Sequence, residues 1–480
     1  MKTYFNGVTR LPSYDISPDV EVFELNGYKI IVDPSYGGWC VGTELDIIRI
    51  FSKLGIDFET AEKLFNSNII SRNGSRVFEK NTYDLASGQL YYYEINLTDA
   101  CNLKCSYCSG ESVSPQHGKF LEESTARKWL DRIIEHSLKK NIKYIILEFT
   151  GGEPLLNIPV LKYLLEYAEK LRKKYNLCFN YQIQTNLSIP LSDEVIKLLV
   201  DLNVSIGTSI DGPKELHNKA RPARNKNGNG LSITLDNIKR IRNTGHRLEG
   251  VLTTISSETV DHIQEIGEFL IDNGFTQLAF TPLRPAGRAK NFNDLVPDPR
   301  KHAREIYKFF INYTVPIYKK TGKMITERYM NTALANLLQP YRLYMCAREV
   351  CGATTNICAT TVDGDVYPCN EHWSDDYLLG NIWDKSFEEM MNSVPAKILK
   401  GRRIKNIEEC KICNIRAFCQ SPCPNGAILK YGELNKPSID CDFWKELYTS
   451  IILGLIEGEI DLEVAQEQVK RLTLKSAKTL

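Results

Sequence analysis

Three cysteines lie close together in the segment NLTDACNLKCSYCSG, where Cys101, Cys105 and Cys108 have a CxxxCxxC spacing. Three thiolates on one short loop can bind three irons of a [4Fe–4S] cluster and leave the fourth iron open, and soft sulfur ligands favour iron–sulfur or zinc over hard cations. A zinc knuckle is the alternative. Structural zinc has four closed ligands, whereas this motif has three cysteines and the next histidine, His117, lies nine residues on. The spacing therefore favours a cluster.

The remaining cysteines form a second island. The chain has 14 cysteines, and nine of them fall between Cys346 and Cys441. Such numbers indicate disulfides in a secreted protein, and metal binding or catalysis in a cytosolic one. Two cysteine-rich islands that flank a cysteine-poor body are typical of separate metal sites. Cys40 and Cys178 stand alone and are expected to be core residues.

Composition excludes several classes of function. The 480 residues carry 60 basic and 59 acidic side chains, which argues against a nucleic-acid partner. The short basic run from Leu399 to Lys405 is interpreted as a solvated surface. No apolar run approaches the roughly 18 residues that span a bilayer, so no membrane partner is expected. The first residues do not form a secretory signal, and we therefore expect a cytoplasmic location.

The elements that must position the first cysteine group alternate between strand and helix. Expected strands cover 91–98, 143–150, 178–185, 203–210, 248–254 and 276–283, and expected amphipathic helices cover 125–139, 160–174, 194–201, 231–243 and 260–273. Six such units predict an α/β fold, a parallel sheet that curls into a full or partial (β/α)6 TIM-like barrel. Most of the strands are near-continuous apolar runs, which predicts burial on both faces. Polar motifs follow the first four strands, at the ends where barrels carry their chemistry.

The chain divides into five expected parts. Residues 1–88 form an α+β module with a hairpin at Asn26-Gly27, helices near 43–54 and 60–66, and a second short hairpin at 71–78. Residues 89–290 form the partial barrel, 291–345 a helical bridge and 346–446 a cysteine-rich domain. Residues 447–480 are expected to form a helix and a tail.

The first cysteine motif and its neighbours resemble the radical S-adenosylmethionine (SAM) superfamily. The motif follows a first barrel strand and has an aromatic residue before its last cysteine. Gly151, Gly152, Glu153 and Pro154 resemble the GGEP motif of this family, which binds the amino group of SAM; glycines allow backbone carbonyls to approach, and the glutamate supplies a countercharge. By the same resemblance Gln184, Thr185 and Asn186 lie near the ribose, and Ser209 and Arg221 contact the SAM carboxylate. A surface salt bridge is the alternative for the arginine.

The resemblance implies a radical reaction. SAM chelates the open iron, one electron from the cluster cleaves its S–C5′ bond, and the resulting 5′-deoxyadenosyl radical abstracts hydrogen from an unactivated C–H bond. The barrel positions the substrate and excludes competing reactions.

The second island resembles the SPASM extension of radical SAM enzymes. The spacing Cys351-x12-Gly364-x4-Cys369, then Cys410-x2-Cys413-x5-Cys419-x3-Cys423, then Cys441, fits its seven-cysteine pattern. By that resemblance the distal auxiliary cluster binds Cys410, Cys413, Cys419 and Cys441, and the nearer one binds Cys351, Cys369 and Cys423. Cys346, Cys358 or a substrate thiolate completes the nearer site. The protein would thus hold three [4Fe–4S] clusters. Two zinc ribbons are the alternative, although these thiolates interleave instead of pairing as CxxC halves.

The first 88 residues resemble the winged-helix-like module with which maturases of ribosomally made peptides capture a leader peptide as an added strand; a structural cap is the alternative. Together the parts predict a peptide maturase that forms a thioether between a cysteine sulfur and a carbon, of the sactipeptide or ranthipeptide type. Its partners would be a precursor peptide with a leader and an electron donor such as flavodoxin or ferredoxin. Carbon–carbon crosslinking, epimerisation and formylglycine formation in a sulfatase are alternatives within the chemistry, and a zinc-binding scaffold is the alternative outside it.

Overall fold

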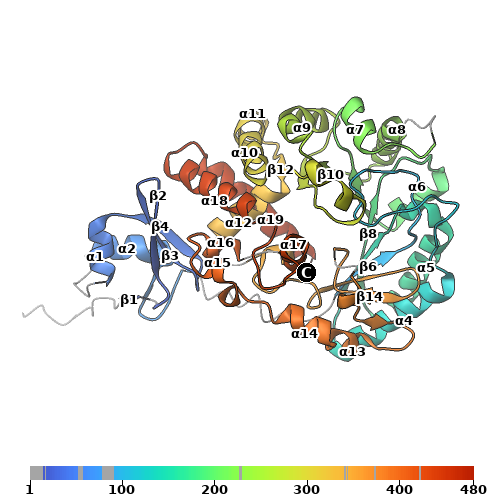
Figure 1. Cartoon of the computed structure of the whole chain (residues 1–480), viewed down its shortest axis with the longest axis horizontal. Coiled ribbons are helices and arrows are strands. Elements are labelled where there is room, and N and C mark those ends of the chain that lie inside the picture. The colour runs from blue at the N-terminus through green and yellow to red at the C-terminus, as the bar shows by residue number, and fades with distance from the viewer. Residues whose placement is uncertain are drawn as a thin grey trace, which may run out of the picture.

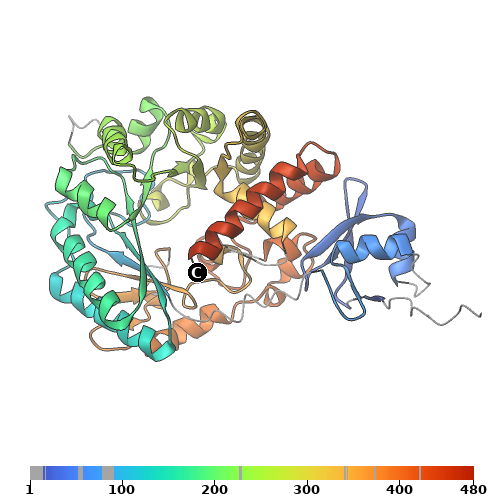
Figure 2. The ribbon, with the colours of Figure 1, turned by 180° about the vertical axis from the view of Figure 1, so that it is seen from behind.

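A computed structural model describes residues 14–16, 18–51, 58–77, 91–225, 230–339, 342, 344–371, 374–420 and 423–479. Figure 1 shows the N-terminal module at one end of the molecule and the central sheet, with its outer helices, at the other. The last long helices lie between them, as the view from behind in Figure 2 also shows. No helix in these residues is long and apolar enough to cross a membrane.

The six predicted strands form one parallel array in sequence order. They are β6 (Tyr92–Asn96), β7 (Tyr144–Thr150), β8 (Cys178–Thr185), β9 (Ser205–Ser209), β10 (Gly250–Ile255) and β11 (Gln277–Pro282). Each pairs in parallel with its neighbour, so all six carboxyl ends lie at one edge of the sheet. The parallel sheet predicted from the sequence is confirmed.

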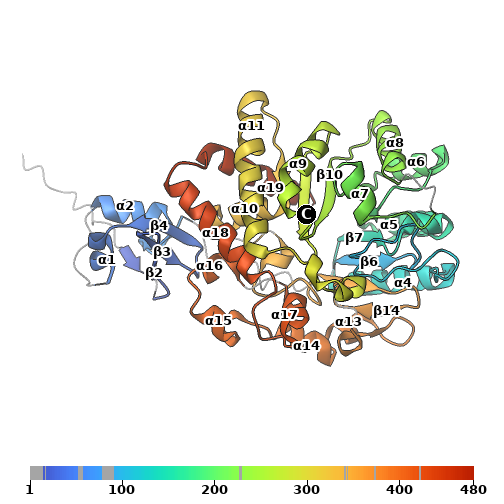
Figure 3. The ribbon, with the colours of Figure 1, turned by 45° about the horizontal axis from the view of Figure 1, so that its top comes forward.

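Helices between the strands cover the outer face of this sheet (Figures 1 and 3). They are α4 (Glu123–Lys140), α5 (Ile158–Tyr175), α6 (Asp193–Asp201), α7 (Lys214–Ala220), α8 (Gly230–Asn243) and α9 (Ile263–Asp272). The helix α7 was not predicted, and the boundaries of the other five lie close to the predicted ones. Asn141 and Asn176 end α4 and α5 in the left-handed conformation.

The prediction that the strands are buried on both faces is wrong. Ile95, Leu147 and Ile183 are buried under the outer helices. The residues that alternate with them, such as Glu148 and Gln182, face the inner side and are only half-buried. Since side chains alternate along a strand, the sheet has an apolar outer face and a polar inner face.

The sheet extends beyond the six strands on both sides. β12 (Thr326–Glu327) pairs with β11, and β13 (Ile357–Thr360) pairs in parallel with β6. β14 (Asp365–Tyr367) and β15 (Gly380–Asn381) then add antiparallel strands. The expected helical bridge therefore contributes a strand, in addition to α10 (Pro299–Phe309), a π-helical turn (Phe310–Thr314), α11 (Val315–Thr321) and α12 (Arg328–Leu338).

The C-terminal part consists of short helices and two long ones. The short helices are α13 (Phe387–Met391), α14 (Val394–Lys400), α15 (Glu408–Lys411), α16 (Arg416–Cys419) and α17 (Pro424–Tyr431). The long ones are α18 (Cys441–Ile456) and α19 (Leu462–Thr479). The rings of Phe443, Trp444 and Tyr448 on α18 belong to the main hydrophobic core together with the barrel residues. The cysteine-rich part is therefore packed on the barrel rather than separate from it.

The N-terminal module is α+β, as expected. Its antiparallel sheet has β2 (Glu21–Leu25), β3 (Tyr28–Asp33) and β4 (Gly38–Gly42), followed by α1 (Glu44–Phe51) and α2 (Phe58–Asn66). The predicted Asn26-Gly27 turn is present, with both residues at positive φ. The predicted second hairpin is present as a tight turn, because Arg72 and Ser75 exchange backbone hydrogen bonds (2.8 and 3.0 Å) around Asn73 and Gly74, both at positive φ. On its other side β5 (Ile70–Arg72) pairs with β1 (Tyr14–Ile16), and residue 78 of the prediction lies outside the described residues.

Candidate functional site

The loop that carries the first three cysteines folds back over the carboxyl ends of the strands. Its two ends are bonded to the sheet, since the Leu97 N–H donates to Thr150 (2.9 Å) and the Leu121 N–H donates to Leu97 (2.9 Å). Inside the loop the Cys101 N–H donates to Val113 (2.9 Å). Cys101 is buried, and Cys105 and Cys108 are half-buried. Burial raises the pKa of the Cys101 thiol to about 12, so a metal that binds it must displace a proton.

Two glycines allow the second motif to lie directly against this loop. A side-chain carbon on Gly151, which has a φ of +133°, would lie 2.2 Å from the Thr98 carbonyl oxygen, and one on Gly152 would lie 2.1 Å from that of Ala100. The Gly152 N–H donates to Thr98 (2.7 Å). Glycine is therefore required at both positions for the β7 end to touch the cysteine loop.

Glu153 is buried at the junction of three loops. It is 0% exposed, and its carboxylate accepts hydrogen bonds from the Leu155 N–H (3.0 Å), the Thr185 hydroxyl (2.6 Å) and the Asn186 N–H (2.8 Å). Burial raises its pKa to about 7. These bonds tie the end of β7 to the end of β8. Pro154 begins the 3-10 turn Pro154–Asn157 that follows.

The residues predicted near the ribose and the carboxylate of SAM form a row along the inner rim. The Asn186 side-chain amide donates to the Cys101 sulfur (3.7 Å) and to Asn102 (3.0 Å). The Gln184 amide donates to the Ser209 hydroxyl (3.1 Å), and it passes over Gly207, where any side chain would collide with it. The structure thus brings Gln184, Asn186 and Ser209 together beside the cysteine loop.

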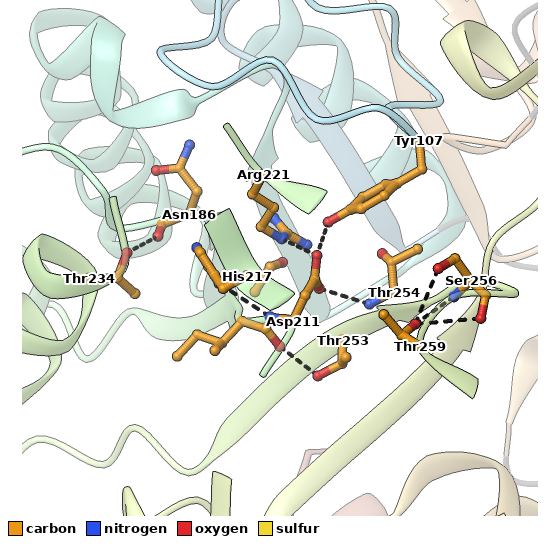
Figure 4. Close-up of polar contacts among 12 residues, drawn as sticks. Tyr107, Asn186, Asp211, His217, Arg221, Thr234, Thr253, Thr254, Ser256 and Thr259 are labelled. Carbon is orange, nitrogen blue, oxygen red and sulfur yellow. Dashed lines mark hydrogen bonds and ion pairs between the residues drawn. The ribbon is translucent and has the colours of Figure 1, made fainter. Parts of the chain in front are cut away.

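Arg221 belongs to a buried ionic cluster. Its Nε donates to the Asp211 carboxylate (2.8 Å), which also accepts from the Thr254 N–H (3.0 Å) and from the Tyr107 hydroxyl. Figure 4 shows Asp211 between Tyr107 and Arg221. Arg221 is 8% exposed and Asp211 is 0% exposed, so the arginine is not part of a surface salt bridge. Sequence reasoning missed Asp211, although its place directly after β9 in SIDGP was a usable signal.

A five-residue segment after β11, Arg284–Arg288, was also missed, and we call it the β11 strap. Gly287, with a φ of +56°, lies so close to the cysteine loop that a side-chain carbon would be 2.2 Å from the Ser109 carbonyl oxygen. The Arg288 N–H donates to Cys108 (3.0 Å), and its guanidinium donates to the carbonyls of Cys105 and Ser112. The strap thus holds the part of the cysteine loop from Cys105 to Ser112, whereas Gly152 touches Ala100.

Four C-terminal cysteines surround one pocket. Cys410, Cys413, Cys419 and Cys441 line it together with residues that include Arg416 and Lys445. These are the four cysteines expected to bind the distal cluster. In the part of the chain that the structure describes, no three His, Cys, Asp or Glu side chains converge closely enough to bind a single ion. A donor set that consists of spread thiols around a pocket fits an iron–sulfur cube better than one zinc ion.

The other C-terminal cysteines gather near the barrel. Cys346 is exposed at the surface. The protein packed around its sulfur reduces solvation, and this together with the nearby thiols of Cys351 and Cys423 raises its pKa. Burial, Glu94 and Cys351 raise the pKa of Cys369. Cys358 is fully buried within β13, where burial and Glu94, rather than another cysteine, raise its pKa. Cys346 thus has Cys351 and Cys423 as neighbours, whereas Cys358 has Glu94.

The expectations for Cys178 and for the basic run from Leu399 to Lys405 are wrong. Cys178 is exposed at the start of β8 and is not a core residue, whereas Cys40 is half-buried. In the basic run, Arg402 is only 3% exposed, and its guanidinium donates to the carbonyls of Leu434 and Lys436 (both 2.9 Å). The run is therefore not a solvated surface throughout.

The inner face of the sheet carries a polar cluster between the two cysteine islands. The Tyr92 hydroxyl donates to Glu148 (2.7 Å) and contacts Gln182 (3.0 Å). Glu94 lies directly opposite Glu148 in the register of β6 and β7. Its carboxylate accepts a hydrogen bond from the N–H of Asn370 (2.9 Å), the residue after Cys369. Burial and the neighbouring Glu148 raise the pKa of Glu94 to about 8. This face can bind or deprotonate a substrate between the two islands.

Comparisons with known proteins agree with this geometry. A radical SAM superfamily model matches residues 95–270, and an iron–sulfur cluster-binding domain, SPASM, matches residues 351–414. The chain thus contains a radical SAM domain and a SPASM domain, and it is an enzyme. Its cofactors are SAM, a [4Fe–4S] cluster and auxiliary iron–sulfur clusters.

Particular relatives extend the comparison. A cysteine-type anaerobic sulfatase-maturating enzyme of Clostridium novyi (strain NT) is 27% identical over 361 residues, which are 74% of this chain and 93% of the relative. Native anSMEcpe, solved with bound AdoMet and the Cp18Cys peptide, has a TM-score of 0.65 and 22% identity and covers 77% of this chain and 99% of its own. Streptococcus suis SuiB, solved with its precursor peptide SuiA, has a TM-score of 0.53 and 14% identity, with coverage of 89% and 100%. The two structures show a shared fold.

Proposed function

We propose that this chain is a radical SAM peptide maturase that forms a thioether, from a cysteine sulfur to a carbon of another residue, in a ribosomally made precursor peptide. The bound cofactors would supply the radical that abstracts hydrogen and an acceptor for the electron left after bond formation. Bond formation would remove from the peptide one hydrogen atom, which would leave in 5′-deoxyadenosine, one thiol proton, which a base would take up, and one electron, which an auxiliary cluster would accept.

The residues have distinct proposed roles. Cys101, Cys105 and Cys108 bind the SAM-cleaving cluster. The rim residues bind SAM; they are Gly151, Gly152, Glu153, Pro154, Gln184, Asn186, Ser209 and Arg221. The nearer auxiliary cluster binds Cys346, Cys351, Cys369 and Cys423, and the distal one binds Cys410, Cys413, Cys419 and Cys441. Glu153 accepts three hydrogen bonds from the chain itself, so its role is to hold the rim together while the adjacent backbone contacts SAM.

The observation that carries the proposal is the position of the polar inner face. Glu94 and Glu148 lie on strands whose carboxyl ends hold the SAM rim, and Glu94 is bonded to Asn370, next to Cys369. A peptide bound there would have the radical on one side and the nearer auxiliary cluster on the other. With its pKa raised to about 8, Glu94 is a stronger base than an ordinary carboxylate, and its ionised form, which increases as the pH rises above 7, would accept the thiol proton.

The N-terminal module supports a substrate with a leader. β2 and β4 are the outer strands of its three-stranded sheet, and an outer strand can pair with an extended peptide. We propose that this winged-helix-like module binds the leader. Coverage by the SuiB structure, 89% of this chain against 77% by anSMEcpe, is consistent with a module that the sulfatase maturase does not share.

A mass measurement tests the proposal. Anaerobically reconstituted enzyme is incubated with SAM, a reductant and the short peptide encoded beside its gene. We expect each crosslink to remove two hydrogen atoms and one thiol that iodoacetamide can alkylate. An unchanged mass would exclude crosslinking, and a loss of two hydrogens with the thiol still alkylated would indicate a carbon–carbon bond instead.

Formylglycine formation is the second candidate because the relatives include a sulfatase-maturating enzyme. A deletion of residues 1–88 separates the two functions. The deletion should abolish modification of a leader-bearing peptide and leave reductive SAM cleavage intact. If the deleted enzyme still oxidises the cysteine of a sulfatase-derived peptide, the second function is correct. Flavodoxin or ferredoxin is the proposed electron donor in either case.

A further inference from the structure

The β11 strap contacts the surroundings of all the cysteine groups. At its C-terminal end, Gly287 and Arg288 hold the backbone of Cys105, Cys108 and Ser109, as described above. At its N-terminal end, Arg284 extends toward the other island. All these contacts are made within a segment of five residues, so the strap sets the spacing between the SAM-cleaving site and the nearer auxiliary site.

Arg284 makes two strong contacts there. Its Nη1 donates to the Cys423 sulfur (3.4 Å), and its Nη2 is paired with the Asp440 carboxylate (2.6 Å). Glu371 lies 3.5 Å from the same guanidinium, two residues after Cys369. The arginine side chain is 19% exposed and the Asp440 side chain 10%, so solvent screens these interactions weakly.

Cys423 has an unusual backbone conformation. Its φ is +48°, an uncommon conformation for a residue other than glycine. Asp440 is itself bonded to Ser438 and directly precedes Cys441 of the distal group. The guanidinium is therefore fixed between a sulfur of the nearer group and the segment that begins the distal one.

A hydrogen bond to a cluster sulfur and a nearby positive charge both favour the reduced cluster, since reduction adds negative charge. We propose that Arg284, through its hydrogen bond to the Cys423 sulfur, raises the reduction potential of the nearer auxiliary cluster. This cluster would then accept the electron released on the inner face of the sheet. The inference rests on the proposed binding of that cluster by Cys423, but it does not depend on which peptide is modified.

The test is an EPR-monitored redox titration of the full-length, anaerobically reconstituted enzyme without peptide. R284Q should lower the reduced-to-oxidised ratio of one auxiliary cluster about tenfold at a fixed potential, equivalent to about 59 mV for a one-electron couple. The signal of the SAM-cleaving cluster should change by less than about twofold, because the strap contacts that loop through other residues. R284K, which keeps the charge without the planar fork, should give a smaller shift of about threefold.

The matched control is R247Q, which removes one charge from an exposed side chain paired with Glu249. It should leave every cluster unchanged. C423A identifies the affected signal, because it should abolish the cluster that R284Q shifts. Unshifted auxiliary clusters in R284Q, or an equal shift in R247Q, would overturn the inference. If R284Q fails to incorporate iron, R284K decides, and a wild-type potential in R284K rejects the proposal. None of these outcomes bears on the peptide assay.

Discussion

Glycine at 152 illustrates how a single residue positions the site. Its N–H donates to Thr98, and the space where a side chain would begin is already occupied by the Ala100 carbonyl oxygen. The sequence suggested that the glycines let backbone atoms approach SAM. In the structure their first role is to let the β7 end touch the cysteine loop.

We therefore predict that G152A pushes the cysteine loop away from the rim. A contact of 2.1 Å against backbone cannot relax by a side-chain rotation, so the cost should be roughly 1–3 kcal/mol. Reductive cleavage of SAM, measured as 5′-deoxyadenosine, should fall at least about tenfold. G250A is the control, since nothing lies within 4 Å of a side chain there. Equal activity of both variants with wild type would contradict this account of the rim.

The buried pair Asp211–Arg221 leads to a second prediction at this scale. D211N leaves Arg221 buried without a countercharge and should lower the free energy of unfolding by about 3–5 kcal/mol. The equivalent surface change, D193N, removes a partner of Arg240 that is 93% exposed. We expect it to cost about 0–1 kcal/mol. Chemical denaturation of the two variants under anaerobic conditions provides the comparison, and similar midpoints would show that the Asp211 cluster is not structural.

At this scale the sequence predicted the cysteines and most rim residues because each lies in a short contiguous motif. It did not predict Asp211, Arg284 or Arg288. Their roles depend on loops that are far apart in the chain, such as Cys105 and Arg288, and no local spacing encodes that meeting. Cys178 was misjudged because a lone cysteine carries no periodicity that distinguishes exposure from burial.

The junction of β11 and α12 carries a prediction at the scale of elements. Glu327 is 1% exposed at the N-terminus of α12, and its carboxylate accepts hydrogen bonds from the N–H groups of Phe280 (3.2 Å) and Met330 (2.9 Å). Burial raises its pKa to about 7. The folded state therefore prefers the protonated form, so stability from this group is complete below about pH 4.3 and is lost as the pH rises through 7.

E327Q should remove up to about 3 kcal/mol of the pH-dependent part of the unfolding free energy, because glutamine does not titrate. The variant should also be less stable overall, because it loses one acceptor oxygen. Stability measured by urea unfolding between pH 5 and 8 should fall with rising pH in wild type and fall less in E327Q. D298N, at the exposed N-terminus of α10, should keep the wild-type slope. A slope in E327Q as steep as that of wild type would mean that other buried groups are responsible.

The regular elements were predictable because the long strands and helices have clear periodicity. β12 and β13, with two and four residues, are too short for such a pattern. They form because the ends of the sheet offer unpaired backbone groups to segments that tertiary packing brings near. The polar inner face was also missed, although Asn180, Gln182 and Gln184 alternate with apolar residues in their strand, and this period of two indicates one polar face.

The whole molecule depends on how the N-terminal module docks. The Trp39 indole N–H donates to the Leu337 carbonyl (2.9 Å), and its ring meets Phe418 edge-on with centroids 6.3 Å apart. Glu21 is paired with Arg416, between Cys413 and Cys419 of the distal group. Docking thus joins the proposed leader-binding sheet to the cysteine-rich part.

W39A should loosen this contact, with a cost of about 2–3 kcal/mol for a half-buried ring. Hydrogen exchange of β2–β4 should become faster while that of β7 and β8 stays unchanged, and the yield of modified peptide should fall more than SAM cleavage does. W39F keeps an aromatic ring, although a smaller one, and loses the indole hydrogen bond, so its effect should be smaller, about 1–2 kcal/mol. Unchanged exchange in W39A would show that other contacts hold the module.

The most direct measurement concerns the three cysteines of the first loop. After anaerobic reconstitution, wild type should contain about 12 irons per chain, and the C101A/C105A/C108A variant should contain about 8 while its C-terminal clusters persist. With dithionite and SAM, the variant should produce no 5′-deoxyadenosine. If it retains the full iron content or continues to cleave SAM, these thiols do not bind the catalytic cluster and the account is wrong.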